Sequence, residues 1–384
     1  MITSRLRPFG TTIFSEMTRL ALEHGAVNLS QGFPDFEGPA RVIEAAVAAL
    51  RGGHNQYARS MGLPPLVEAV AAHRARWYGQ RFEPSSEVAV TTGATEGIAA
   101  AILGLLEPGD EVILFEPFYD SYPAAVALAG CTAKCLTLRF PDFALDVDAL
   151  RSLVGERTRL LVLNSPHNPS GKVFTRAELE AIAALCVERD LLVLCDEVYE
   201  HLTYGAAHVP LATLPGMRER TLTTSSLGKT FSFTGWKIGW LTGPKELVAA
   251  AQAAHQFLTF ATATPLQIAA AEALRSCDEP FVEGLQGAYR SRRDFLVDTL
   301  RAAGFAVSVP AGAYFVLADF SALSREDDRS FAERLVRQVG VAAIPPSCFY
   351  AADPAEGRRL LRFAFCKRLE TLEAAAERLR VLAG

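Results

Sequence analysis

Residues 226–240 of this chain read SLGKTFSFTGWKIGW. The stretch sets Lys229 between a hydroxyl at Ser226 and a second lysine at Lys237, in an apolar, glycine-rich setting. Burial beside another cation lowers the pKa of a lysine, and a neutral amine attacks carbonyl groups. Periodicity alone favours a strand and turn with two solvated lysines, which is the usual state of lysine.

The composition is that of an ordinary globular chain. Its 384 residues allow two or three domains, and 50% of them are hydrophobic. The net charge is −5 and the basic residues do not cluster, so we expect no nucleic-acid partner. We find no export segment and no apolar run that spans a bilayer, so we expect no membrane partner. The seven cysteines fit a reducing cytoplasm better than a disulfide framework.

Short apolar runs alternate with helical patterns between residues 87 and 243. The runs predict strands at residues 87–93, 111–115, 160–164 and 191–195, with helices at 94–106 and 175–190. Buried strands separated by helices indicate an α/β fold, with a mostly parallel central sheet flanked by helices. Ligands bind beyond the carboxyl ends of such strands, which is where the sequence places Thr95, Asn168, Asp196 and Lys229.

The C-terminal part predicts a smaller α+β unit. A long helix is expected at residues 280–303, with Pro280 in its first turn. Strands are expected near residues 305–309, 314–317, 341–344 and 360–366, and helices near 330–339 and 370–382. We predict a large domain of residues 45–278 and a small domain of residues 1–44 and 279–384.

The pattern S-x-G-K-T-F-S-x-T-G-W-[KR]-x-G-W resembles the signature of class I aminotransferases of fold type I, which depend on pyridoxal 5'-phosphate (PLP). Within that family it resembles the group of methionine and kynurenine–glutamine aminotransferases. The resemblance implies that Lys229 carries PLP as an imine, and that Ser226 and Lys237 contact its phosphate. Many members have arginine at the position of Lys237, and lysine cannot make the planar bidentate contact of arginine.

Further motifs that follow the predicted strands resemble the cofactor contacts of this family. The free N–H groups at the start of a helix bind phosphate, and T-G-A-T-E-G (92–97) stands at the start of a predicted helix. Taken alone, this segment is explained equally well as an ordinary glycine turn in which Thr95 caps the helix. A carboxylate that ends a buried strand is costly unless paired. D-E-V-Y-E (196–200) implies a carboxylate at the ring nitrogen and a tyrosine at the ring oxygen. N-P-S-G (168–171), which by itself is only a turn, implies that Asn168 contacts the same ring oxygen. E-P-F-Y-D (116–120) implies that Tyr119 stacks on the cofactor ring. The implied cofactor contacts are Gly93, Ala94, Thr95, Tyr119, Asn168, Asp196, Tyr199, Ser226, Lys229 and Lys237.

Two motifs resemble the family's substrate contacts. A lone arginine in the apolar strand L-L-R-F-A-F (360–365) is costly unless it meets an anion. The match implies that Arg362 clamps the substrate α-carboxylate; an internal salt bridge is the alternative. N-L-S-Q-G-F-P-D-F (28–36) implies that the backbone of Gly32 approaches the same carboxylate, and Asn168 is implied as a substrate contact too.

Two segments resemble those that enter the active site of a neighbouring subunit. N-Q-Y (55–57) implies Tyr57 at the neighbour's phosphate, and H-Q-F-L-T-F (255–260) implies Phe260 at its substrate. Buried aromatics within one subunit are an equal alternative, so the homodimer rests on resemblance. The second segment lacks the arginine that aspartate aminotransferases commonly contribute. The missing arginine, together with the apolar rings of Phe33 and Phe260, favours substrates with apolar or uncharged side chains, such as methionine, aromatic amino acids or glutamine.

The sequence therefore predicts a PLP-dependent transaminase that acts on an L-amino acid and a 2-oxo acid. A C–S β-lyase acting on cysteine conjugates or cystathionine shares every cofactor residue and remains open. A PLP-binding regulator without turnover usually carries a DNA-binding domain, and the segment before Gly32 is too short for one. The preferred donor and 2-oxo acid are not determined by these motifs.

Overall fold

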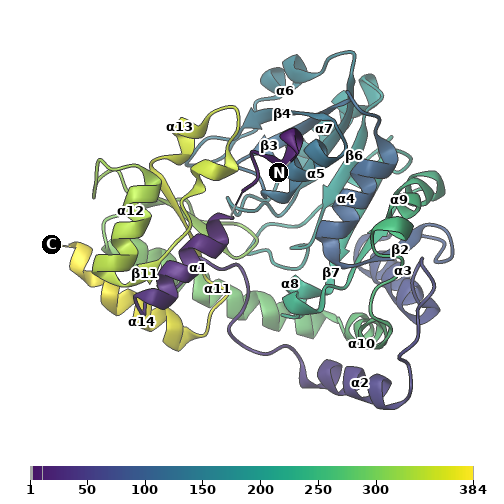
Figure 1. The fold of residues 1–384 in the computed structure, drawn as a ribbon, viewed down its shortest axis with the longest axis horizontal. Helices are drawn as coiled ribbons and strands as arrows, with labels where there is room; N and C mark the ends of the chain where they lie inside the picture. The colour runs from purple at the N-terminus through teal and green to yellow at the C-terminus, as the bar shows by residue number, and fades with distance from the viewer. Residues whose placement is uncertain (1–2, 11, 384) are drawn as a thin grey trace.

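The computed structural model describes residues 3–10 and 12–383. A seven-stranded sheet forms the centre of the larger part of the molecule (Figure 1). In spatial order its strands are β2 (Val88–Thr91), β8 (Gly239–Thr242), β7 (Thr221–Ser226), β6 (Leu192–Asp196), β5 (Thr158–Asn164), β3 (Glu111–Glu116) and β4 (Thr132–Thr137). Strand β8 runs antiparallel to both neighbours, and the pairs from β7 to β4 are parallel. The predicted mostly parallel sheet is confirmed.

Helices cover both faces of this sheet because side chains alternate along each strand. The even-numbered apolar residues of β3 and β5 pack with α4 (Gly93–Leu105), α5 (Ser121–Leu128) and α9 (Lys245–Leu258). The odd-numbered ones pack with α6 (Val147–Leu153) and α7 (Arg176–Glu188). At the β2 edge a third cluster joins α2 (Ala40–Arg51), α3 (Pro64–Tyr78) and α10 (Thr264–Arg275).

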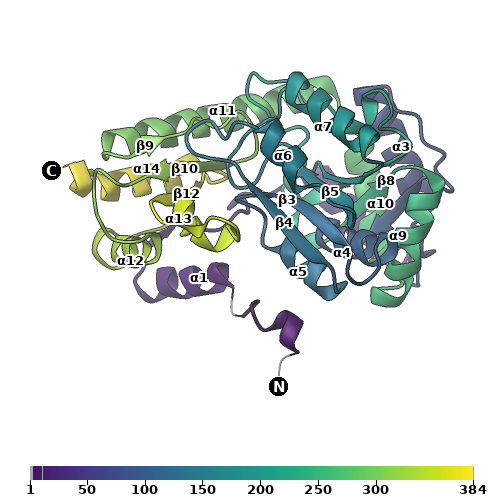
Figure 2. The same cartoon turned by 90° about the horizontal axis from the view of Figure 1, so that it is seen from above.

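The smaller part is the predicted α+β unit. Strand β10 (Phe315–Asp319) pairs antiparallel with β9 (Ala306–Val307) and β12 (Leu360–Ala364), and β1 (Val27–Asn28) pairs with β11 (Val341–Ala342). Its helices are α1 (Ile13–Glu23), α11 (Glu279–Ala302), α12 (Asp328–Arg334), α13 (Pro354–Gly357) and α14 (Leu369–Leu379). The long helix α11 extends from beside the large sheet to the smaller part (Figure 2). The proposed division at residues 44/45 and 278/279 stays a prediction.

Helix boundaries follow from capping residues. Thr175 and Glu178 form a reciprocal capping box at the start of α7, and Asp278 accepts a hydrogen bond from the Phe281 amide at 3.0 Å at the start of α11. The helix predicted at residues 330–339 begins at Asp328 and ends in a π-helical turn, Leu335–Val339. None of the described helices combines the length and apolarity needed to cross a bilayer.

Candidate active site

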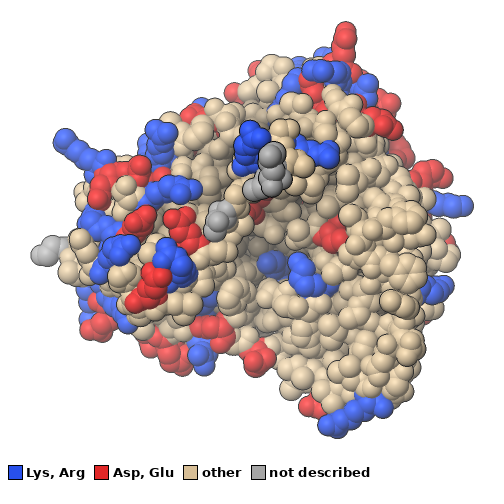
Figure 3. Space-filling model, in the orientation of Figure 1, with Lys and Arg blue, Asp and Glu red and all other residues tan. Residues whose placement is uncertain are grey.

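A pocket lies beyond the carboxyl ends of β5, β6 and β7, where ligands bind in sheets of this type. The last residues of these strands, Asn164, Asp196 and Ser226, line it. Figure 3 shows a hollow near the middle of this face of the molecule, with basic side chains in and beside it. The predicted contacts that line the pocket are Gly93, Ala94, Thr95, Tyr119, Asn168, Asp196, Tyr199, Ser226, Lys229 and Lys237.

Lys229 belongs to the short helix α8 (Leu227–Thr230), which follows β7 directly. Its ammonium Nζ donates to the hydroxyl of Tyr314 at 3.1 Å and lies 5.6 Å from the centre of the Tyr199 ring. The surrounding protein desolvates this amine and lowers its pKa to about 8. A lysine with this pKa has a substantial neutral fraction near pH 8, so it can act as a nucleophile and accept a proton.

Asp196 presents a buried carboxylate to the same pocket. One oxygen, Oδ2, accepts the Tyr122 hydroxyl at 2.6 Å, and Oδ1 accepts the Val198 amide at 3.2 Å. Burial raises the pKa of this carboxyl group, although both hydrogen bonds act in the opposite direction. An isolated buried carboxylate is costly, and a cation beside it reduces that cost. A protonated pyridine nitrogen is such a cation, so the site fits the ring of PLP.

The start of α4 forms a cradle for an anion. Gly93 has a φ of +73°, and a Cβ there would lie 3.1 Å from Cε and 3.2 Å from Nζ of Lys237. A side chain at residue 93 would therefore occupy the space in front of the lysine. The ammonium of Lys237 stands next to the free N–H groups of the helix start, a combination that binds phosphate. Ala94, Thr95 and Ser226 line the same pocket.

Tyrosine and asparagine side chains surround the space between this cradle and Lys229. The hydroxyl of Tyr119 lies 3.4 Å from Oγ1 of Thr95, and the Tyr199 ring packs edge-on against Tyr314, 5.1 Å between centres. The Asn168 amide donates to Oδ1 of Asn164 at 2.7 Å, which fixes the turn after β5. Flat apolar faces and polar groups at the edges suit a planar ring with oxygen and nitrogen substituents.

Arg362 lies on β12 next to the pocket, although it is not part of its lining. Its guanidinium is buried and donates to Oδ1 of Asn168 at 3.3 Å and to the Ser30 carbonyl at 3.0 Å. Its Nε has no hydrogen-bond partner, and no carboxylate forms a salt bridge with it, within the described residues. Burial lowers the pKa of this group to about 10. A buried guanidinium without a counter-ion is suited to the carboxylate of a ligand.

The hydroxyl of Tyr314 links Gly32 to Lys229 by two hydrogen bonds. The Tyr314 hydroxyl donates to the Gly32 carbonyl at 2.5 Å and accepts from Lys229. A Cβ on Gly32 would lie 2.7 Å from the Phe315 ring, so the close approach of this loop requires glycine. The loop that carries the predicted substrate motif therefore lies beside the lysine.

Tyr57 and Phe260 lie outside this pocket. Their rings contact edge-on with centres 5.4 Å apart, and they are 87% and 46% exposed. Within one chain neither side chain is a buried core aromatic. Their large exposed areas leave both rings available to a second molecule.

Sequence reasoning missed several lining residues and Tyr314. The pocket also includes Ile98, Tyr122, Asn164, Val198, Gly228, Phe233, Thr234 and Ile238. The place of Asn164 at the end of a predicted strand was a usable signal. No local pattern marked Tyr122 or Tyr314, because they reach Asp196 and Lys229 from distant segments.

Known proteins resemble this chain over its whole length. Residues 25–379 match the family described as aminotransferase class I and II. A probable N-succinyldiaminopimelate aminotransferase of Mycobacterium tuberculosis is 50% identical over 396 residues, covering 100% of this chain and 99% of the relative. The methionine aminotransferase of Escherichia coli is 44% identical over 380 residues, covering 99% and 98%. The solved structure of the Mycobacterium tuberculosis N-succinyldiaminopimelate aminotransferase has a TM-score of 0.97 at 50% identity, with both chains fully covered.

Proposed function

The chain belongs to the class I and II aminotransferases, and from this we propose that it is a PLP-dependent enzyme that transfers the amino group of an apolar or uncharged L-amino acid to a 2-oxo acid. The predicted family and enzyme class are confirmed by the comparisons. Methionine, aromatic amino acids and glutamine are the donors we propose.

One observation carries this proposal: two cations without salt-bridge partners stand at one site. Within the described residues neither Lys229 nor Arg362 forms a salt bridge, and Asn168, which lines the pocket, accepts from Arg362. Such a pair suits a ligand that brings a carboxylate to one cation and a reacting carbon to the other. An α-amino acid has this form.

PLP, when bound, supplies the electron sink for the α-carbon of the amino acid. We assign its phosphate to Gly93, Ala94, Thr95, Ser226 and Lys237, its ring nitrogen to Asp196, its ring oxygen to Asn168 and Tyr199, and its ring face to Tyr119. Lys229 would hold the cofactor covalently through its amine, and the free amine would accept and return the proton at the α-carbon of the substrate. The hydroxyl of Tyr314 orients the Lys229 amine for this transfer.

The substrate carboxylate is assigned to Arg362, with Gly32 and Asn168 beside it. The guanidinium is held by two hydrogen bonds and lies with its central carbon 4.2 Å from the centre of the Phe315 ring. These contacts fix its plane, which is the requirement for a bidentate contact. Binding at Arg362 directs the α-carbon toward Lys229.

The description of one relative suggests a second candidate substrate. This relative, which is 50% identical, is a probable N-succinyldiaminopimelate aminotransferase. That substrate carries carboxylates beyond the α-carboxylate. Among the pocket-lining residues the cations are Lys229 and Lys237, and both have other roles in our assignment. The described lining that one chain contributes therefore offers no further cation to these carboxylates, and the comparison makes the succinylated diamino acid the competitor to test.

We also propose that the enzyme is a homodimer. Tyr57 and Phe260 are exposed side by side, as expected for residues that complete a neighbour's site. The surface over α8 and α10 carries few charges in Figure 3, as the central part of an interface between subunits often does. A fully active monomer in light scattering would reject this proposal.

All seven cysteines are free, which supports our placement of the enzyme in the cytoplasm.

A half-reaction screen tests the substrate assignment. The cofactor-loaded enzyme is mixed with each amino acid, and conversion to the pyridoxamine form is followed by absorbance. We expect the fastest conversion with methionine, aromatic amino acids or glutamine. Faster conversion by N-succinyldiaminopimelate would replace that assignment. Release of pyruvate from a cysteine conjugate without added 2-oxo acid would identify a C–S β-lyase instead.

A further inference from the structure

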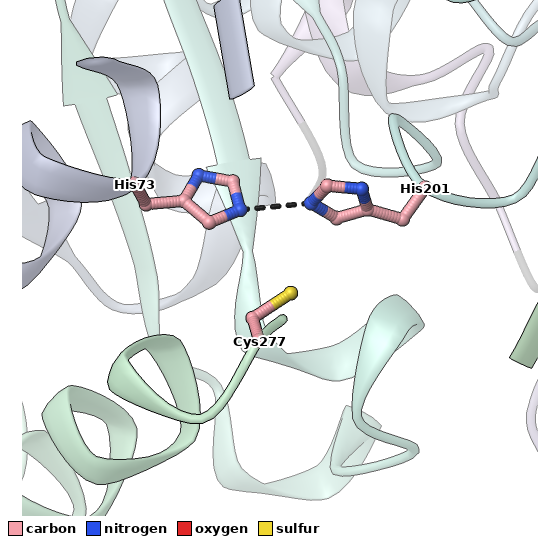
Figure 4. A group of neighbouring side chains, drawn as sticks. All are labelled: His73, His201 and Cys277. Carbon is pink, nitrogen blue, oxygen red and sulfur yellow. Dashed lines mark hydrogen bonds between the residues drawn. The ribbon is translucent and has the colours of Figure 1, made fainter. Parts of the chain in front are cut away.

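Three metal-ligating side chains form a buried cluster outside the pocket: His73, His201 and Cys277. His73 belongs to α3, His201 to the turn after β6, and Cys277 directly precedes the N-cap of α11. The three side chains converge (Figure 4), and their ligand atoms all lie within 4.8 Å of one another. Three distant segments therefore each supply one potential ligand to the same point.

The two imidazoles meet through their Nε2 atoms, 2.8 Å apart, with ring planes at 90°. One hydrogen at most fits between the two nitrogens, so at least one of them directs a lone pair into the cluster. Two nitrogens on one tetrahedral zinc lie roughly 3.3 Å apart, given Zn–N distances of about 2.0–2.1 Å. To bind the ion, the two nitrogens therefore move apart by roughly half an ångström, and the rings turn so that both lone pairs point at the metal.

The neighbouring charges favour a cation at this place. Glu200 precedes His201 in the chain. The Arg74 guanidinium forms salt bridges with Glu200 at 3.1 Å and with Glu197 at 2.8 Å, and all three side chains are buried. His208 also approaches Glu197, at 3.3 Å. Two carboxylates around one guanidinium leave negative potential in a poorly solvated region, and a metal ion beside them reduces its cost.

A cavity gives access to the cluster. Its lining includes His73 and Cys277 as well as Arg76, whose side chain is 43% exposed. This opening provides a path for an ion and room for a water molecule as the fourth ligand. Three protein ligands and one water are a common arrangement around zinc.

We propose that His73, His201 and Cys277 form a site for a zinc-like transition-metal ion. Two imidazoles and a thiolate are ligands that zinc prefers over magnesium or calcium. The ion joins α3, the turn after β6 and the start of α11. Because residues 196–201 also carry Asp196 and Tyr199, this ion braces the segment that positions two pocket residues.

Cobalt and zinc titrations of the cofactor-loaded, chelator-treated enzyme test the site. We expect one equivalent of Co²⁺ to produce the visible d–d bands of a tetrahedral site, at wavelengths beyond the cofactor's absorbance. One equivalent of Zn²⁺ should bind in equilibrium dialysis. Cys277→Ser and His73→Gln should each weaken zinc binding at least about tenfold, because even the loss of a group that only orients a ligand weakens metal binding by about 10- to 100-fold. Cys186→Ser, which removes another buried thiol outside the cluster, should leave binding unchanged.

Two variants are used so that the result does not depend on how one substitution affects folding. Cooperative thermal unfolding and circular dichroism identify a natively folded variant. Transamination does not serve this purpose, because the ion supports two pocket residues. Failure of the wild type to bind one equivalent of either metal would overturn the proposal. Equal zinc affinity in the wild type and in either natively folded variant would do so too. A loss of binding in Cys186→Ser as large as that in Cys277→Ser would also overturn it.

Discussion

Replacing Arg362 with lysine is expected to reduce the use of amino acids by about 10- to 150-fold, while barely changing the use of the corresponding amines. A lysine keeps the positive charge but gives up the second, parallel hydrogen bond to the substrate carboxylate. A hydrogen bond to a charged group contributes about 1.5–3 kcal/mol. At about 1.4 kcal/mol for each factor of ten, this loss corresponds to the stated range in kcat/KM.

The structure makes this estimate specific to the carboxylate. Arg362 has no salt bridge to lose among the described residues, and its remaining hydrogen bonds go to Asn168 and the Ser30 carbonyl. An amine substrate has no carboxylate, so it makes no use of the guanidinium. The difference between acid and amine therefore isolates the contact between Arg362 and the carboxylate.

The assay compares the half-reaction of methionine with that of its decarboxylated amine, in the wild type and in Arg362→Lys. Arg359→Lys, an exposed substitution near the same strand, serves as the control. Equal losses for acid and amine would show that the substitution disturbs the pocket generally. An unchanged rate with methionine would refute the clamp itself.

Three further predictions follow from the pocket. The rate at which apoenzyme takes up PLP covalently should rise as the pH increases through about 8, because only the neutral amine of Lys229 attacks and its pKa is lowered to about 8; a midpoint near the ordinary lysine value would contradict this. Asp196→Asn should slow transamination by at least about 100-fold, since the loss of a charge-assisted contact to the ring nitrogen costs about 3 kcal/mol, and an unchanged rate would remove Asp196 from that role. Lys237→Ala should mainly weaken cofactor retention in dialysis, and a variant that retains PLP as firmly as the wild type would exclude Lys237 as a phosphate contact.

Sequence reasoning succeeded where chemistry is concentrated in one segment. Strand β6 is a continuous apolar run that ends at Asp196, so both its burial and the place of its carboxylate were readable locally. The same holds for the glycine turn that begins α4. Because parallel strands bring their carboxyl ends to one edge, such local signals also predicted which residues meet.

The features that were missed depend on packing between distant segments. Strand β7 contains Thr, Leu and Ser without an apolar run, and its burial comes from its position between β6 and β8. Tyr122 and Tyr314 reach the pocket from α5 and from the residue before β10, with no motif that marks them. The His73, His201 and Cys277 cluster is likewise assembled from single residues of three segments.

The central claim is that Lys229 is the residue that holds the cofactor. The most direct measurement is borohydride reduction of the cofactor-loaded enzyme, followed by peptide mass spectrometry. We predict that the added mass of the reduced cofactor lies on Lys229, and that Lys229→Ala shows neither this label nor transamination. A label on Lys237 or another lysine, or an active Lys229→Ala enzyme, would contradict the account.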